Sequence, residues 1–131
     1  MNKLEKICLA IQEHEGYFPP CDTYPMGSRS YRNNNPGNLR RSKFQAGTRA
    51  GFSYFNSYEE GFKALMWDIE QKCKGNTSTG LGPEKTLLDL FKVYAPAEDQ
   101  NDPTSYANTV AKKLGVPVSL KLKELLKVED A

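Results

Sequence analysis

The chain has 131 residues, of which 38% are hydrophobic, so it is long enough for one compact domain with a core and too short for two ordinary domains. Its formal net charge of +2 excludes a protein that binds nucleic acid through charge spread over its whole surface. No apolar run approaches the roughly 18 residues of a membrane span, and the first residues lack the pattern of a signal peptide. We therefore expect synthesis in the cytoplasm and no membrane span.

The first predicted element is an amphipathic helix over residues 3–15. Apolar residues recur in it at the i, i+3, i+4, i+7 spacing that places them on one face. Gly16 follows as a left-handed cap, the conformation that commonly ends a helix. The apolar face consists of Leu4, Ile7, Cys8 and Ile11.

Glu15 is the candidate catalytic residue of this helix. On a helical wheel it continues the apolar face, whereas Glu13 points to the opposite side, toward solvent. A carboxyl group at the end of a buried face is partly desolvated, which favours its neutral form and suits a general acid. The other interpretation is a partly exposed glutamate with a salt bridge, which is common in the last turn of a helix.

A long segment from Tyr17 to Arg41, rich in Pro, Gly, Ser and Asn, predicts an ordered but irregular loop, and loops of this length are usually functional. It contains the run Asn33-Asn34-Asn35-Pro36-Gly37-Asn38. Asparagine favours turns and tolerates left-handed backbone, so the run is explained by a tight turn alone. Its four amides also suit a neutral polar ligand such as a sugar. We expect Asn35 and Asn38 to face a cleft with Glu15, and Asn33 or Asn34 to serve the backbone.

The segment from Thr23 to Tyr58 contains six basic residues and no acidic residue, so it predicts a basic surface. The basic residues are Arg29, Arg32, Arg40, Arg41, Lys43 and Arg49.

The rest of the chain predicts a small β excursion among helices, hence an α+β fold that is mostly helical. Aromatic residues and glycines over 44–56 indicate one or two short strands, and Ser57 with Glu60 forms the pattern of a capping box that opens the central helix, over 57–74. The later elements are a loop from Gly75 to Pro83, a short helix from Thr86 to about Ala95, a helix from Asp102-Pro103 to Gly115, and a last short helix from Ser119.

The three cysteines and the single histidine have no metal-ligand spacing, so we expect neither a metal nor another cofactor. Cys8 and Cys73 fall on apolar helical faces and are expected to be buried, whereas Cys21 lies in a loop. His14 is expected at the surface, and one histidine without a nucleophile motif gives no Ser/His/Asp arrangement.

Four segments, taken in order, are similar to the small lytic transglycosylase-like proteins of phages, prophages and mobile elements, which belong to the lysozyme-like superfamily. The resemblance covers roughly residues 4–116. It implies one lysozyme-like catalytic domain over residues 1–131, delivered to the cell wall by a phage or holin route or carried in a virion. The segments are Ala10-Ile11-Gln12-Glu13-His14-Glu15-Gly16-Tyr17-Phe18, Arg32 to Arg40, Phe55 to Leu65, and Tyr94-Ala95-Pro96 with Asp99, Asn101 and Tyr106.

The resemblance implies cleavage of the β-1,4 bond between MurNAc and GlcNAc in peptidoglycan, with Glu15 as general acid and base and a 1,6-anhydro product. A hydrolase of the muramidase type needs a second carboxylate, for which Asp22 is the acid of the long loop. A lytic transglycosylase uses the substrate's own acetamido group and 6-hydroxyl instead. The implied substrate-binding residues are Asn33, Asn35, Asn38, Tyr94 and Tyr106.

Two other functions compete with the enzyme. The first is a glycan-binding or virion structural module that keeps the fold without turnover. The second is nucleic-acid binding by the basic segment with Tyr31 and Phe44, which we do not expect because loop arginines more often lie solvated at a surface. The expected partner is therefore the peptidoglycan glycan strand, bound by a monomer.

Overall fold

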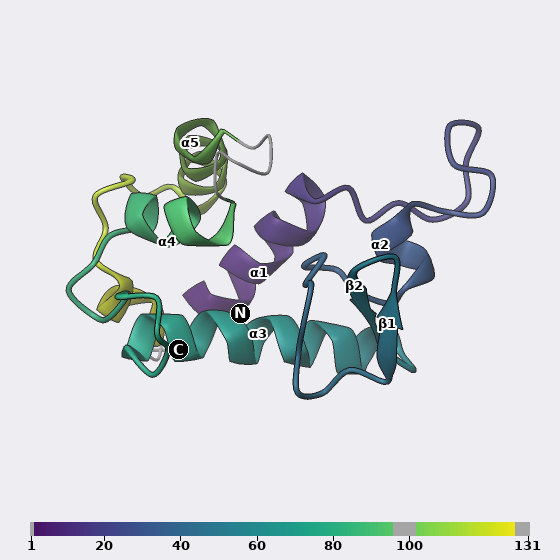
Figure 1. Ribbon diagram of the computed structural model, residues 1–131. Helices are drawn as coiled ribbons and strands as arrows, with labels where there is room; N and C mark the ends of the chain where they lie inside the picture. Colours follow the sequence, from purple (N-terminus) through teal and green to yellow (C-terminus); the bar gives the residue numbers. More distant parts are fainter. Residues whose placement is uncertain (1, 96–101, 128–131) are drawn as a thin grey trace. The chain divides into compact units, whose positions relative to one another are not determined.

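The computed structural model describes residues 2–95 and 102–127. In this part the chain is mostly helical, with five α-helices and one small antiparallel hairpin (Figure 1), which confirms the predicted α+β class. The residues group into two compact units, one made of Met1–Ile7 with Ile69–Ala131 and the other of Cys8–Asp68. Two helices, α1 (Lys3–His14) and α3 (Tyr58–Lys74), contribute residues to both units.

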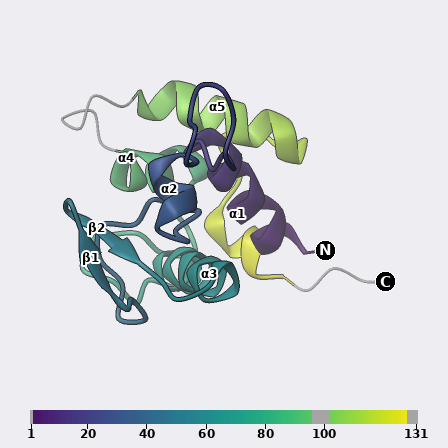
Figure 2. The ribbon, with the colours of Figure 1, turned by 90° about the vertical axis from the view of Figure 1, so that its right-hand side faces the viewer.

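The Cys8–Asp68 unit contains the hairpin that the aromatic and glycine pattern predicted. Strands β1 (Gly47–Arg49) and β2 (Phe52–Tyr54) pair in antiparallel register, with Gly47 opposite Tyr54 (Figure 2). The two residues between the strands, Ala50 and Gly51, have φ angles of 50° and 85°. Positive φ at both central residues is typical of the tight turns that join twisted strands.

A short helix in this unit, α2 (Arg29–Arg32), falls inside the segment that was predicted to be irregular. Ser28 caps it, because its hydroxyl accepts a hydrogen bond from the Tyr31 N–H at 3.4 Å. A helix of one turn is too short to show an apolar period, so the cap was its only signal in the sequence.

Helix α3 begins as predicted, with Ser57 accepting a hydrogen bond from the Glu60 N–H at 3.2 Å. Apolar residues recur along α3 at helical spacing, and three of them, Leu65, Ile69 and Cys73, are 0% exposed. Phe62 and Met66, on the same face, are partly buried. The face predicted for α1 is also buried, at Leu4, Ile7, Cys8 and Ile11.

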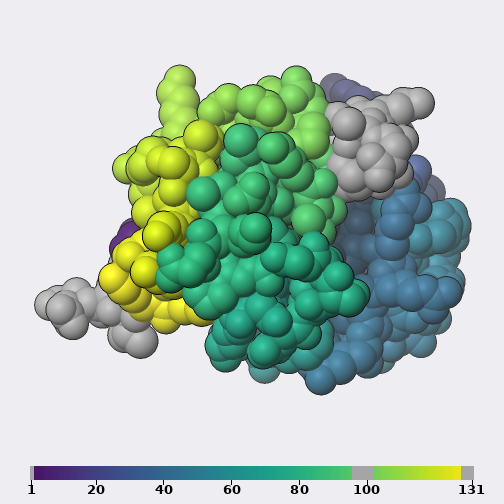
Figure 3. All heavy atoms as spheres, turned by 60° about the vertical axis from the view of Figure 1, so that its left-hand side comes forward, coloured from purple at the N-terminus to yellow at the C-terminus, as the bar shows by residue number. Residues whose placement is uncertain are grey.

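The other unit contains α4 (Leu87–Tyr94) and α5 (Pro103–Leu114), as the capping signals predicted. The last short helix, expected from Ser119, is a 3-10 helix that begins later, at Leu122, and ends at Leu126. Thr86 and Asp89 form the capping box of α4, and Asp102 caps α5. The segment before the 3-10 helix pairs with the start of α4. The Leu87 N–H donates to the carbonyl of Leu120, and the Leu122 N–H donates to the carbonyl of Lys85. These segments lie side by side in Figure 3.

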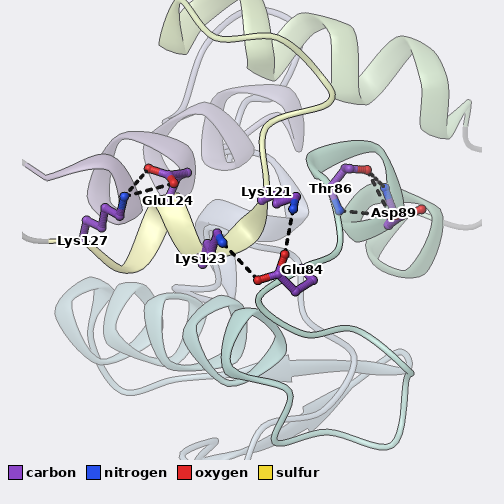
Figure 4. A network of polar contacts seen from close by, with 7 residues as sticks. All are labelled: Glu84, Thr86, Asp89, Lys121, Lys123, Glu124 and Lys127. Carbon is purple, nitrogen blue, oxygen red and sulfur yellow. Dashed lines mark hydrogen bonds and ion pairs between the residues drawn. The ribbon is translucent and has the colours of Figure 1, made fainter.

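Charged side chains fasten the same region at the surface. Glu84 accepts hydrogen bonds from Lys121 at 2.8 Å and from Lys123 at 3.0 Å (Figure 4). The hydrogen bonds from the two lysines lower the pKa of Glu84 below its usual value. Because all three side chains are exposed to water, these pairs contribute little to stability.

The described residues were searched for membrane-spanning helices and for groups of metal-binding side chains. No helix among residues 2–95 and 102–127 is long and apolar enough to cross a membrane. In the same ranges, His, Cys, Asp and Glu side chains nowhere come together in threes as they would around a metal ion.

The cysteines differ in a way that thiol chemistry can measure. Cys8 and Cys73 are buried, as predicted, whereas Cys21 is exposed. Burial raises the pKa of the Cys73 thiol to about 12, so it has almost no reactive thiolate at pH 8. We expect a thiol reagent such as DTNB to label one cysteine per native chain at pH 8 and three in denaturant. The Cys21→Ser variant should lose the native label, and labelling of that variant in the native state would contradict the structure.

Candidate functional site

Glu15 directly follows the last residue of α1, and its N–H still donates to the Ile11 carbonyl at 2.8 Å. Its side chain is partly buried, whereas Glu13 is exposed. Gly16 then turns the chain out of the helix with a φ angle of 74°. The wheel position of the two glutamates and the glycine cap are therefore confirmed.

Two buried serines fasten the turn after Glu15 to the start of α2. Ser28 binds Phe18 twice: its hydroxyl accepts from the Phe18 N–H, and its own N–H donates to the Phe18 carbonyl, both at 2.9 Å. The Ser30 hydroxyl donates to the Gly16 carbonyl at 3.3 Å. Ser28 and Ser30 are 7% and 3% exposed, so these hydrogen bonds are shielded from water.

Ser30 also connects this turn to the asparagine run. The carbonyl of Ser30 accepts a hydrogen bond from the Asn35 N–H at 2.8 Å. One residue therefore bonds to Gly16 through its side chain and to Asn35 through its backbone. Ser30 therefore brings Gly16, the residue after Glu15, close to the asparagine run. The sequence did not reveal this arrangement.

Asn35 differs from the expectation that it faces a sugar. Its side chain is 0% exposed, and its amide nitrogen donates to the carbonyls of Leu39 and Ser53, each at 2.9 Å. Its amide oxygen accepts from the Leu39 N–H at 2.9 Å. Both amide hydrogens are thus used inside the loop, and the prediction that Asn35 lines a cleft is wrong. Asn35 instead holds the loop against strand β2.

We expect Asn35→Ala to lower the free energy of unfolding by about 2 kcal/mol, because it removes three buried hydrogen bonds and leaves backbone groups without partners. Chemical denaturation followed by circular dichroism measures this change. Asn76→Ala is the control, since that side chain is exposed and, among the described residues, bonds to Gln71 alone. Equal stabilities of the two variants would contradict the role given to Asn35.

Asn33 and Asn34 serve the backbone, as was expected of at least one of them. Asn33 is the C-cap of α2, is 4% exposed, and its carbonyl accepts from the Phe55 N–H at 2.9 Å. The amide of Asn34 donates to the Phe55 carbonyl at 3.0 Å, and its φ angle is 51°. Asn33 was also predicted to bind substrate, and its burial at the helix cap does not favour that.

Asn38 is the asparagine of the run that keeps an unused hydrogen-bonding atom. Its backbone is left-handed, with a φ angle of 51°. Its amide oxygen is buried and has no hydrogen-bond partner among the residues that the structure describes. A buried acceptor without a partner is unusual in proteins and calls for an explanation.

Aromatic rings lie around the turn that follows Glu15. The ring of Tyr17 is 5.4 Å from the rings of both Tyr31 and Tyr58, and Tyr58 donates to the Gln12 side chain at 2.7 Å. Burial raises the pKa of Tyr17 and of Tyr58, so both hydroxyls are neutral at neutral pH.

Glu59 is an acid near this cluster that the sequence analysis did not single out. Its negative charge adds to the rise in the pKa of Tyr17, after burial and the neighbouring Tyr58 and Tyr31. Its carboxylate is therefore close enough to act on a residue two positions from Glu15. Asp22, the acid that was considered as a second carboxylate, is exposed in the loop between Phe18 and Ser28.

Tyr94 and Tyr106 belong to the other unit. Tyr106 is 2% exposed and stacks on Phe91, with ring centres 4.6 Å apart. It is thus a core residue, and its burial corrects the expectation that it contacts substrate. Tyr94 is partly buried, 6.3 Å from Tyr106. Pro96, Asp99 and Asn101, which carried part of the resemblance, lie outside the described residues.

The basic segment forms an exposed surface, as predicted. All six of its basic residues are exposed, and within the described ranges none of them forms an ion pair. Aromatic rings hold several of them instead: Arg29 and Arg40 lie 4.6 and 4.8 Å from the centre of the Phe52 ring, and Arg49 lies 4.0 Å from that of Tyr54. Contacts of this kind fix the direction of a cation without neutralising it.

Comparison with known proteins identifies no relative of this chain. No protein-family model, no curated protein and no solved structure matches the chain.

Proposed function

We propose that this protein cleaves the glycan strands of peptidoglycan, with Glu15 as the general acid. One observation carries the proposal: Glu15, a partly buried glutamate, directly follows α1, and the residue after it is joined through Ser30 to the asparagine run. A carboxyl group between a core and a polar loop suits proton transfer to a glycosidic oxygen. The resemblance of the chain to lytic transglycosylase-like proteins points to the same reaction.

The proposed reaction needs one carboxyl group. Glu15 donates its proton to the oxygen of the glycosidic bond, and the bond between that oxygen and C1 of the MurNAc residue breaks. The carbonyl oxygen of the substrate's own 2-acetamido group stabilises the positive charge that develops at C1. The Glu15 carboxylate then takes the proton of the 6-hydroxyl as O6 bonds to C1, which forms the 1,6-anhydro product and restores the acid.

Asn38 is the proposed contact for an acetamido group. Its buried amide oxygen accepts no hydrogen bond from the described residues, and an acetamido N–H is a donor of matching strength. Tyr17 and Tyr31 supply hydroxyls and ring faces beside the same turn.

Replacing the other candidate acids distinguishes a transglycosylase from a hydrolase. A hydrolase requires a second carboxylate as nucleophile or as base for water, and the two candidates are Asp22 and Glu59. We expect Asp22→Asn and Glu59→Gln each to keep cleavage of purified peptidoglycan within about threefold of the wild type, a small change beside the 10²-fold or more that a lost catalytic base costs. Loss of activity in either variant would identify the second carboxylate and favour a hydrolase.

The competing function, a binding module without turnover, predicts a different pattern. Such a protein would sediment with insoluble peptidoglycan and release no soluble fragments from it. Release of fragments by wild type but not by Glu15→Gln therefore supports the enzyme and excludes the module.

A further inference from the structure

A pocket of about 310 Å³ lies in the Cys8–Asp68 unit, and its lining includes none of the residues described around Glu15 except Leu39, the partner of Asn35. The segment before β1 forms one wall, and α3 forms the other. The charged and aromatic residues that line it are Arg41, Lys43, Trp67 and Asp68, with Gln45 and Leu39 between them.

The loop wall of this pocket is held in shape by its own polar side chains. The Gln45 side-chain oxygen accepts from the Ser53 hydroxyl at 2.7 Å and from the Ser42 N–H at 3.2 Å. The Ser42 hydroxyl accepts from the Phe44 N–H at 3.1 Å. Gln45 therefore ties the loop to strand β2, so the pocket does not depend on a ligand for its shape.

The two cations of the pocket have no acidic partner in the described part of the chain. Lys43 places its ammonium 4.2 Å from the centre of the Trp67 ring and 5.1 Å from that of Phe44. Arg41 is exposed, and neither cation takes part in an ion pair between described residues. An ammonium held over a ring and an exposed guanidinium both favour an oxyanion such as a carboxylate or a phosphate.

The pocket also contains groups that a simple polyanion would not match. Asp68 contributes a negative charge to the lining, and Trp67 and Leu39 contribute apolar surface. A chain of phosphates would be repelled by Asp68. The lining fits a ligand that combines a carboxylate, an N–H or ammonium donor and an apolar part.

We propose that this pocket binds the peptide stem that a peptidoglycan strand carries. Arg41 and Lys43 bind a carboxylate of the peptide, Asp68 accepts from its N–H or ammonium groups, and Trp67 packs against its aliphatic part. The choice of a peptidoglycan peptide rests on the proposed function, whereas the class of ligand rests on the pocket. The pocket would then select strands that carry peptides over naked glycan.

Trp67 is the only tryptophan of the chain, so its fluorescence reports on the pocket directly. The ligand is a GlcNAc–MurNAc disaccharide that carries a short peptide with free carboxylates. It has no MurNAc–GlcNAc bond to cut, so its binding is independent of Glu15. We expect a saturable change in fluorescence, and binding at least about tenfold weaker for the same disaccharide without peptide, as for loss of a charge-assisted hydrogen bond.

Variants locate the binding by calorimetry, because substitution of Lys43 itself alters Trp67 fluorescence. Arg41→Gln with Lys43→Gln should weaken binding of the peptide-bearing disaccharide at least about tenfold. Arg49→Gln is the matched control, since Arg49 is exposed and lies over Tyr54, and it should bind like wild type. Circular dichroism confirms that each variant is folded.

Three results would overturn the proposal: equal binding of the two disaccharides, unchanged binding in the double variant, or tighter binding of a glycerol-phosphate polymer or a single-stranded oligonucleotide. A protein that binds the peptide-bearing disaccharide through Arg41 and Lys43 but cleaves no peptidoglycan supports the pocket and removes the proposed function. A protein that cleaves peptidoglycan but binds the two disaccharides equally supports the proposed function and removes the proposal for the pocket.

Discussion

Glu15→Gln should lower the rate of glycan cleavage by at least about 10²-fold, the usual cost of losing a general acid. Glutamine has nearly the shape of glutamate and no acidic proton to give. The side chain is only partly buried, so the substitution should leave the fold intact. Release of soluble fragments from purified peptidoglycan, measured over a range of enzyme concentrations, gives the rate.

Glu13→Gln is the control for this result. It makes the same chemical change two residues earlier, on an exposed position of α1, and should keep the wild-type rate. Thermal unfolding followed by circular dichroism should show that both variants are folded. Near-normal activity of the Glu15→Gln variant would show that Glu15 is not the general acid.

Gly61→Ala should destabilise the protein by about 3 kcal/mol or more, although alanine is ordinarily better than glycine in a helix by about 1 kcal/mol. Gly61 lies in the first turn of α3, and a Cβ atom on it would overlap the carbonyl oxygen of Asn34 and come within 3.1 Å of Pro36. The backbone of the asparagine run cannot move aside easily, because Asn35 anchors it to Leu39 and Ser53.

Chemical denaturation of Gly61→Ala beside Gly82→Ala measures this effect. Gly82 has no positive φ angle, and a Cβ atom on it would meet only Gly75, at 3.8 Å. The control variant should therefore stay within about 0.5 kcal/mol of wild type, as surface substitutions usually do. If Gly61→Ala were as stable as wild type, the close packing of α3 on the asparagine run would be refuted.

The helices were predictable because residues close together in the sequence determine their ends and their apolar faces. Gly16 and Gly115 end α1 and α5 with left-handed backbone, and Asp102 caps α5. These signals depend on residues within one turn of each other, so they need no knowledge of the rest of the fold. Helix α2 lacked such a signal except for Ser28, since four residues cannot show a period.

The candidate site was only partly predictable. The partial burial of Glu15, beside an exposed Glu13, follows from the geometry of α1, and this prediction is confirmed. The roles of the asparagines depend on partners distant in sequence: Asn35 bonds to Ser53 and Asn34 to Phe55. Composition revealed the amides but not which of them the loop itself uses. The resemblance implied that Tyr106 contacts substrate, although stacking on Phe91, a residue distant in sequence, places it in the core.

Mass spectrometry of the fragments released from purified peptidoglycan tests the central proposal most directly. A transglycosylase that relies on Glu15 alone must form the bond between O6 and C1 without adding water. We therefore predict fragments that end in 1,6-anhydro-MurNAc, each lighter by one water than the hydrolysis product, from wild type and from Glu13→Gln. Fragments with reducing ends, or no soluble fragments at all, would contradict the account.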